Sequence, residues 1–145
     1  MEDEALKLDN QLCFPLYACA REVVKLYKPF LSAIGLTYTQ YIAMMVLWEE
    51  KEVSIKRLGE RLHLDSGTLT PLLKRMEKQG LLTRCRSQED ERSVLIQITA
   101  QGEALKAQAI HVPEKMMQCV PLDKEEAVTL YRLLYRLLGE MQAQD

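Results

Sequence analysis

Two short helical patterns, followed at once by two β-prone runs, constrain the fold of this sequence more than any other feature. Ser54 is placed to cap a first helix, and Asp65 or Ser66 to cap a second one. The second pattern runs to about Gln79 and stops at Gly80, after which the helical period of the apolar residues is lost. This order predicts a helix-turn-helix that leads directly into β structure.

The β structure is predicted to be a hairpin with a charged tip. The runs Leu82–Arg86 and Val94–Ile98 enclose an entirely polar stretch, 87–92. A hairpin that follows a helix-turn-helix forms the wing of a winged helix-turn-helix. We therefore expect the DNA-binding region to span about residues 37–99.

Helical patterns flank this region on both sides. The stretch Asp9–Tyr27 carries apolar residues at three- and four-residue steps, and Pro29 and Gly35 are expected to bracket a break after it. A second long apolar stripe runs near the other end of the sequence. Because such helices, at about 8–34 and 112–143, exceed what a small core needs, we expect them to form the dimerisation region of a homodimer.

Further caps complete the pattern. Thr37 and Gln40 form a capping box before an apolar run, and Thr99 is placed to cap a helix that runs toward Ile110. The predicted fold is a single subunit of residues 1–145, mainly α with a small β-wing.

Charge is distributed unevenly along the chain. Between Ser54 and Arg92, nine Lys and Arg residues stand against six acidic residues, so this segment carries +3 and the remainder −5 within a total of −2. A basic middle between acidic ends fits a module that contacts double-stranded DNA. The alternatives are a solvated charged face and a winged domain used for protein contacts.

The helix from Ser66 to Gln79 is the one expected to enter the major groove. Its small polar start lets the backbone approach DNA, and its later basic residues suit phosphates. At the hairpin tip Arg92 suits a narrow minor groove, with Asp90 placed to orient its guanidinium. The residues expected to bind DNA are Ser66, Thr68, Thr70, Pro71, Lys74, Arg75, Arg84, Arg86, Asp90 and Arg92.

Cys13 is predicted to lie near the start of the first helix, where backbone N–H groups and the helix dipole favour a thiolate. A partly exposed thiolate reacts with peroxides to give a sulfenic acid. Hydroxyls of Tyr17, Tyr27 and Tyr38 can hydrogen-bond such a thiolate. Cys119, expected in a break before the last helix, can resolve a sulfenic acid as a disulfide. The alternatives are ordinary packing for Cys13 and the tyrosines, and a bystander cysteine at position 119.

Several other functions find no support in the sequence. The cysteine and histidine spacings do not suit zinc, and no glycine-rich phosphate loop or nucleophile elbow indicates a cofactor or an enzyme. Cys19 is expected to be a packing residue and Cys85 structural or incidental. No apolar run approaches the ~18 residues of a membrane span. Four cysteines without an export signal predict a reducing, cytoplasmic environment.

Four stretches carry more distinctive motifs: Leu8–Phe14, Gly35–Tyr41, Leu64–Glu77 and Glu89–Val94. In this order they resemble the organic-hydroperoxide-responsive repressors, OhrR, of the MarR family, and the resemblance spans nearly the whole chain. The motif around Cys13 separates this branch from the MarR proteins that bind phenolic ligands.

The resemblance implies a dimeric winged-helix repressor of a peroxide-detoxifying gene. The reduced dimer would bind its operator, and oxidation of Cys13 by an organic hydroperoxide would release it. The resemblance also implies that Tyr27 and Tyr38 hydrogen-bond Cys13 from the partner subunit, and that Asp90 and Arg92 form a pair at the wing tip.

Three questions stay open at this level. Pro15 is not expected in the motif around Cys13 and can alter the local helix. The family contains one-cysteine members, capped by small thiols, and two-cysteine members, and Val112–Glu114 with Cys119 downstream resembles the second type. The runner-up function is a MarR-type repressor that is released by a non-covalent aromatic or phenolic ligand. A thiol peroxidase is disfavoured because no peroxidase-type cysteine motif is visible.

Overall fold

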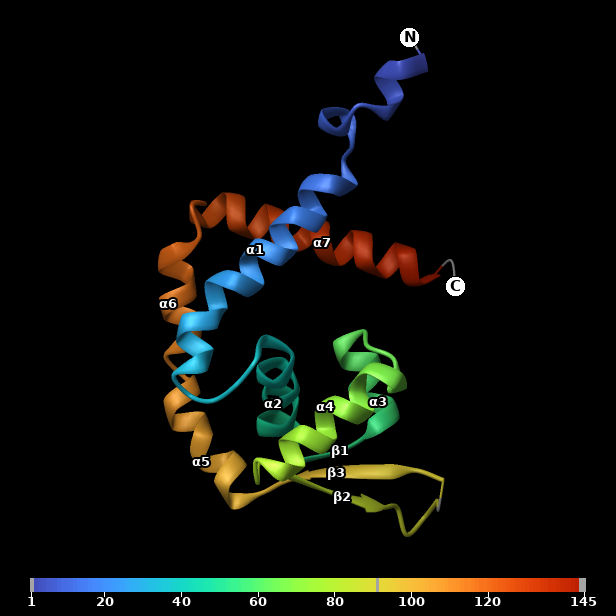
Figure 1. Cartoon of the computed structure of the whole chain (residues 1–145), viewed down its shortest axis with the longest axis vertical. Helices are drawn as coiled ribbons and strands as arrows, with labels where there is room; N and C mark the ends of the chain where they lie inside the picture. Colours follow the sequence, from blue (N-terminus) through green and yellow to red (C-terminus); the bar gives the residue numbers. More distant parts are fainter. Residues whose placement is uncertain (1, 91, 144–145) are drawn as a thin grey trace. The chain divides into compact units, whose positions relative to one another are not determined.

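The computed structural model describes residues 2–90 and 92–143, and it is mainly helical with a small antiparallel sheet (Figure 1). The predicted fold class is therefore confirmed. The chain divides into two compact units, and the boundary along the sequence lies between Pro113 and Glu114. In chain order the elements are η1 (Glu2–Leu6), η2 (Leu8–Asn10), α1 (Cys13–Ser32), α2 (Tyr38–Glu50), β1 (Glu52–Ser54), α3 (Ile55–Leu62), α4 (Ser66–Lys78), β2 (Leu82–Arg86), β3 (Val94–Ile98), α5 (Ala100–Ala109), α6 (Val112–Cys119) and α7 (Lys124–Ala143).

Side-chain caps fix where the helices of the first unit begin. The Thr37 hydroxyl accepts the Gln40 N–H at 3.3 Å, and Gln40 Oε1 accepts the Thr37 N–H at 3.1 Å, which completes the predicted capping box. The caps predicted at Ser54 and Thr99 are also confirmed, and of the two candidates Asp65 and Ser66 it is Asp65 that caps α4. The two helices of the helix-turn-helix and the helix after the wing therefore start where the sequence predicts.

The first helix starts later than the sequence predicts. Residues 8–10 form a separate 3₁₀ turn, and α1 begins at Cys13 rather than near Asp9. Pro15 is the third residue of α1, where its missing N–H costs no hydrogen bond, because the first four N–H groups of a helix have no partner within it. Pro15 is therefore compatible with a regular helix that carries Cys13 at its start.

The first helix also ends later than predicted, because α1 continues through Pro29 to Ser32. Burial of Leu31, which is 1% exposed, outweighs the single hydrogen bond that the proline removes. The helix then ends as the Leu36 N–H donates to the Leu31 carbonyl at 3.0 Å, with Gly35 at φ +76°. This left-handed cap requires the conformational freedom of glycine.

The sheet has three strands in the order β1-β3-β2, all antiparallel. The predicted hairpin supplies β2 and β3, and Val53 of β1 pairs with Ile96 of β3. The sequence missed β1 because three residues are too few to show an alternating pattern. Its partner lies some forty positions further along the chain, so only the tertiary structure creates it.

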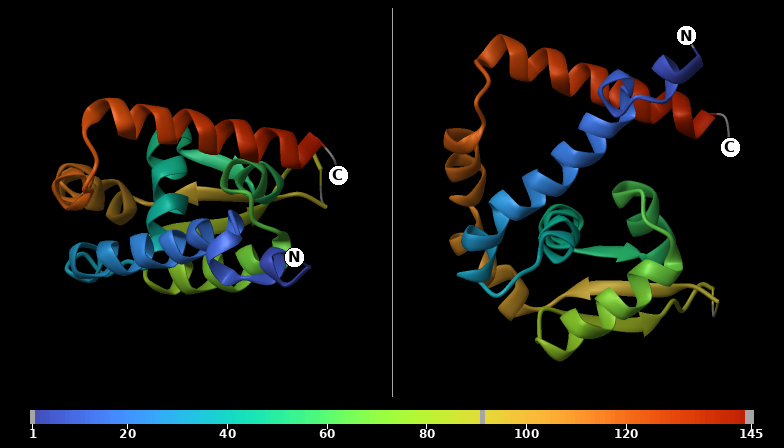
Figure 2. Two further views of the ribbon diagram at one scale, coloured as in Figure 1. Left: turned by 90° about the horizontal axis from the view of Figure 1, so that it is seen from above. Right: turned by 45° about the horizontal axis from the view of Figure 1, so that its top comes forward.

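The core of the first unit lies between the sheet and the helices α2, α3 and α4, which gather on one side of it (Figure 1, Figure 2). The apolar residues predicted to face inward from α4, namely Leu69, Leu72, Leu73 and Met76, are all buried. The β2–β3 hairpin projects beyond these helices as a wing.

The long helices α1 and α7 leave large apolar side chains exposed within the single subunit. On α1 they include Phe14, Leu16, Tyr17, Val23, Val24 and Leu26. On α7 they include Val128, Leu130, Tyr131, Leu133, Leu134, Tyr135 and Leu137. So many exposed apolar side chains on two helices indicate contact surfaces for another protein.

The segment before α7 differs from the prediction. Residues around Cys119 form the end of α6 rather than a loop. Pro113 is the second residue of α6, where its lack of an N–H is tolerated, so this proline marks the start of a helix instead of an irregular stretch.

The buried face of α4 gives a direct test of the core. Replacing Leu73, which is fully buried, with alanine should lower the free energy of unfolding by about 2–5 kcal/mol, because it leaves a cavity. The matched control is Lys74→Ala on the exposed face of the same helix, with an expected change within about 0.5 kcal/mol. Equal losses in both variants, measured by urea denaturation, would show that the α4 face is not the centre of the core.

Candidate nucleic-acid interface and sensing cysteine

The outer face of α4 presents the residues that the sequence assigned to the major groove. Ser66, Thr68, Pro71, Lys74 and Arg75 are all exposed. Backbone N–H groups at the start of a helix, small polar side chains and later basic residues are the donors that phosphates and base edges accept.

Two groups shape the start of this helix. The Asp65 carboxylate accepts the Thr68 N–H at 2.7 Å, and this hydrogen bond holds the pKa of Asp65 below its ordinary value. Thr70 is half-buried, and its hydroxyl donates to the Ser66 carbonyl at 2.9 Å. The Thr70 hydroxyl is therefore directed at its own helix, while Ser66 and Thr68 keep exposed side chains.

The wing exposes Arg86 at the end of β2, and Asp90 and Arg92 at its tip. Asp90 Oδ1 accepts the Arg92 N–H at 3.0 Å, and the Asp90 carbonyl accepts the Ser93 N–H at 2.9 Å. The sequence predicted that Asp90 orients the Arg92 guanidinium, whereas the structure shows Asp90 shaping the backbone of the turn that carries Arg92. Glu91, which belongs to the predicted tip, lies outside the described residues.

Arg84 has a structural role that the sequence did not predict. Its Nε and Nη2 donate to Glu77 Oε1 at 3.2 and 3.1 Å, and its backbone N–H donates to Glu77 Oε2 at 3.0 Å. The side chain is 27% exposed. The pair joins the last turn of α4 to the first strand of the wing. Arg84 therefore fixes two parts of the candidate interface relative to each other, instead of presenting its guanidinium on the wing surface.

Three tyrosines cluster where α1 meets α2. The ring of Tyr27 lies 4.9 Å from that of Tyr38 and 5.8 Å from that of Tyr41, measured between centroids. Burial, and to a lesser extent Tyr38, raises the pKa of Tyr27, so its hydroxyl keeps its proton at neutral pH and can act as a donor. Sequence reasoning missed Tyr41, whose position in the buried run of α2 was the available indication.

Cys13 is exposed and is the first residue of α1. Leu12, at the N-cap, offers no side-chain acceptor to the first N–H groups of the helix. Tyr17 lies one turn further on the same helix and is exposed, with Arg21 Nη1 donating to its hydroxyl at 3.4 Å. Tyr27 lies fourteen residues beyond Cys13, or about 21 Å along the helix axis.

This distance has a direct consequence for the thiol. Within one subunit, Cys13 lies too far from Tyr27 to hydrogen-bond with it, so the predicted site requires a second chain. Cys119 is exposed at the end of α6 and belongs to the C-terminal unit. Cys19 and Cys85 are exposed as well, so the expectation that Cys19 is packed is wrong for the single subunit.

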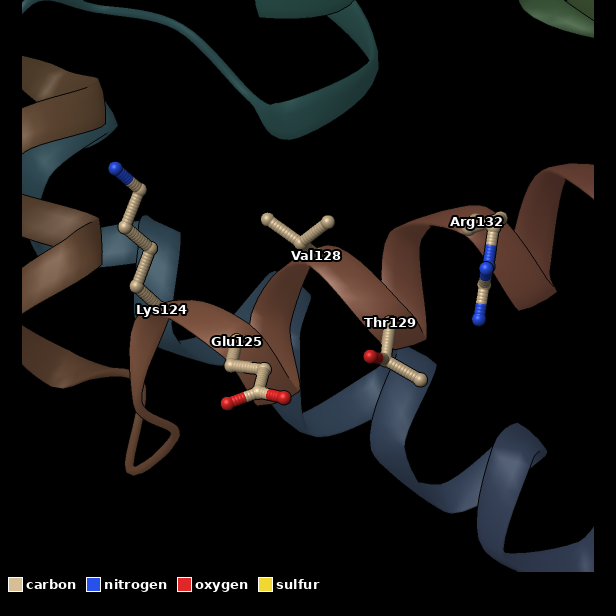
Figure 3. A pocket seen from close by; sticks show the side chains of 5 residues that line it. All are labelled: Lys124, Glu125, Val128, Thr129 and Arg132. Carbon is tan, nitrogen blue, oxygen red and sulfur yellow. The ribbon is translucent and has the colours of Figure 1, made fainter.

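The C-terminal unit carries a shallow hollow on α7, lined by Lys124, Glu125, Val128, Thr129 and Arg132 (Figure 3). All five side chains belong to a single helix, so they give the hollow no opposing wall. Across residues 2–90 and 92–143, no three His, Cys, Asp or Glu side chains are grouped so as to hold a metal ion. No helix within these ranges combines the length and apolar character needed to cross a membrane.

Comparison with known proteins places the chain among transcriptional regulators. The family model described as transcriptional regulator SarA/Rot matches residues 25–109. The organic hydroperoxide resistance transcriptional regulator of Bacillus subtilis (strain 168) is 52% identical over 140 residues, which are 97% of this chain and 95% of that protein.

Solved structures agree with this result. Reduced AbfR bound to DNA, a Staphylococcus epidermidis protein, superimposes with a TM-score of 0.81 at 34% identity and covers 99% of both chains. AbfR with its disulfide formed gives a TM-score of 0.66 at 35% identity, over 97% of this chain and 96% of that chain.

The Glu77–Arg84 pair makes stability depend on pH. Hydrogen bonds from Arg84 hold the pKa of Glu77 below its ordinary value, so the pair stabilises the fold above the ordinary carboxylate pKa. That stabilisation is lost as the pH falls through the lowered pKa. Glu77→Gln should therefore be less stable than wild type at pH 7, and the gap should narrow toward pH 3 in thermal unfolding.

The control for this prediction is Glu89→Gln in the exposed hairpin tip, which should follow the wild-type pH dependence. A gap between Glu77→Gln and wild type that stays constant from pH 7 to pH 3 would contradict an ionic contribution from Glu77.

Proposed function

We propose that this chain, which belongs to the family of the organic hydroperoxide resistance transcriptional regulators of the MarR type, is a DNA-binding repressor that senses organic hydroperoxides through Cys13. The observation that carries the proposal is the 52% identity to the Bacillus subtilis regulator over nearly its full length. The exposed cysteine at the start of α1 supplies the chemistry that such a function needs.

The first step is oxidation of the Cys13 thiolate. The sulfur attacks the terminal oxygen of the hydroperoxide, the O–O bond breaks, and the alkoxide takes up a proton and leaves as an alcohol. Cys13 becomes a sulfenic acid.

The partner subunit completes the site. Since α1 separates Cys13 from Tyr27 of the same chain by about 21 Å, we assign the hydrogen bonds to Tyr27 and Tyr38 of the second protomer. Their phenol hydroxyls act as the donors. Tyr17, one turn from Cys13 on the same helix, is a third candidate donor from the same chain.

The second step is resolution by Cys119. Its thiol attacks the sulfenic sulfur of the partner protomer, a disulfide forms between Cys13 of one protomer and Cys119 of the other, and water leaves. AbfR, the similar regulator, has been solved both reduced on DNA and with a disulfide formed. This supports a two-cysteine mechanism over capping by a small thiol.

The apolar faces of α1 and α7 are the proposed dimer interface, in keeping with arms at about 8–34 and 112–143 around a DNA-binding region at about 37–99. Their exposed leucines, valines and tyrosines need a partner to leave water. A two-fold axis would then present two copies of α4 to adjacent half-sites of the operator.

On each half-site α4 is proposed to enter the major groove and the wing to follow the minor groove. Lys74 and Arg75 neutralise phosphates, and Arg92 reads the width of the minor groove. The other contacts are assigned to Ser66, Thr68, Thr70, Pro71, Arg86 and Asp90. Arg84 acts indirectly, by joining the wing to α4 through Glu77. Such a repressor works in the cytoplasm, and each oxidation is a stoichiometric switch rather than enzymatic turnover.

The sensing role of Cys13 is tested with Cys13→Ser, which keeps the size of the side chain and removes the nucleophile. The variant should bind operator DNA as wild type does and remain bound when one equivalent of cumene hydroperoxide is added, while wild type dissociates. A mobility-shift titration, with protein masses recorded in parallel, measures both. Release of Cys13→Ser by the peroxide would exclude Cys13 as the sensor.

Cys119→Ser separates the two steps. Wild type should give a dimer band on a non-reducing gel that dithiothreitol reverses, and both Cys13→Ser and Cys119→Ser should lack it. Gain of the mass of an added small thiol without any band would show the one-cysteine mechanism instead. A wild type that ignores peroxide and is released by a phenolic ligand would favour the ligand-binding alternative.

The wing is tested with Arg92→Ala, which should weaken operator binding by about 1–3 kcal/mol at matched salt and leave the dimer intact. Arg21→Ala on α1, away from the wing, is the control. An unchanged operator affinity of Arg92→Ala in a fluorescence-anisotropy titration would remove the wing tip from the interface.

A further inference from the structure

Two side-chain amides connect the turn after α1 to the end of α4. Gln40 Nε2 donates to Gln79 Oε1 at 3.1 Å, and Gln79 Nε2 donates to the Gly35 carbonyl at 3.1 Å. Gln40 Oε1 accepts the Thr37 N–H at 3.1 Å. We call the side chains of Gln40 and Gln79, with the Gly35 carbonyl, the amide clip.

The amide clip joins two helix ends of the same kind. Beyond α1, Gly35 is in the left-handed region and Leu36 N–H donates to Leu31 O. Beyond α4, Gly80 is in the same region and Leu81 N–H donates to Met76 O. Each helix end therefore has a fixed geometry of its own. Gln79, the C-cap of α4, ties the two ends together.

Both amides of the clip use their donor and acceptor ends. Gln40 is only 6% exposed, so movement of Gln79 away from it would leave a buried amide without its partner. Gln40 also lies two residues after Tyr38, the first residue of α2. A shift of the turn after α1 is thus resisted by α4, and a shift of α4 is resisted by this turn.

Helix α1 connects Cys13 to the amide clip. It is one unbroken helix of 20 residues, about 30 Å long, with Cys13 as its first residue and the clip just beyond its last. A continuous helix transmits a displacement of its Cys13 end to its opposite end. That end is the one bound to α4 through Gln79.

We propose that Gln79 is the positioning residue that couples the oxidation state of Cys13 to the orientation of the recognition helix α4. The proposal rests on the proposed function, since it needs oxidation at Cys13 and DNA binding by α4. Both the donor and the acceptor end of the Gln79 amide are used within the clip. It acts through the bonds that it makes to Gly35 and Gln40.

The test measures the dissociation constant for operator DNA of the reduced dimer and of the peroxide-oxidised dimer. Its readout is the ratio of the oxidised to the reduced dissociation constant. Gln79→Ala should shrink this ratio by about 2- to 30-fold, because oxidation still moves α1 but no longer moves α4 with it. The rate of Cys13 oxidation, followed by mass spectrometry, should stay as in wild type. A purely structural role would instead lower both affinities and leave their ratio unchanged.

The matched control is Gln101→Ala. Gln101 Nε2 also donates to Gln79, but to its backbone carbonyl at 3.1 Å, and belongs to α5 rather than to the turn after α1. This variant should keep the wild-type ratio. Gln79→Glu is the second test, since it retains an acceptor for Gln40 and loses the donor to Gly35. Gln79→Glu should shrink the ratio as Gln79→Ala does. It keeps the test decisive should the alanine variant fold poorly.

The outcomes separate the clip from the function on which it rests. A wild type that peroxide does not release overturns the proposed function. A wild type that is released normally, with Gln79→Ala and Gln79→Glu released just as completely, overturns the clip alone. An equal decrease of this ratio in Gln101→Ala also overturns the role of the clip, because the effect would then come from general loosening around the end of α4.

Discussion

Burial of one face of α4 is the constraint on which the rest of the first unit depends. Leu69, Leu72, Leu73 and Met76 leave water together, so the opposite face must point outward. That opposite face carries Lys74 and Arg75. The same helix holds the wing through Glu77 and Arg84, and the turn after α1 through Gln79. One packing arrangement therefore presents the candidate DNA surface and ties it to its two neighbours.

The helices α1 and α7 expose apolar side chains to water, unlike the helices around the core. A monomer that leaves so many leucines and tyrosines in water gains free energy by association, which favours the proposed dimer. The straight length of α1 imposes the same requirement on the chemistry, because Cys13 and Tyr27 of one chain lie about 21 Å apart along the helix. Sensing and dimerisation are thus expected to depend on each other, since the proposed donors Tyr27 and Tyr38 can reach Cys13 only from the partner protomer.

Much of this could be read from particular residues. The caps at Thr37, Ser54 and Asp65 act on N–H groups three residues away, so their partners are adjacent in the sequence. The features that sequence reasoning missed depend on long-range pairing, or on burial that offsets an unfavourable local preference. Strand β1 exists only through its pairing with β3, and Pro29 stays helical because Leu31 is buried nearby. Local preference gave the wrong answer in both places, because distant contacts supplied the missing free energy.

The features of the candidate site also fall into local ones and long-range ones. The sequence by itself determined the winged helix-turn-helix, the outward face of α4, the arginines of the wing and the position of Cys13 near a helix start, because each depends on local periodicity, capping and charge. Only the tertiary structure decided that Arg84 is bound to Glu77, and that Gln40 and Gln79 join two helix ends. Those roles depend on which polar groups the fold brings within hydrogen-bonding distance, and residues seven to forty-four positions apart leave no periodic pattern in the sequence.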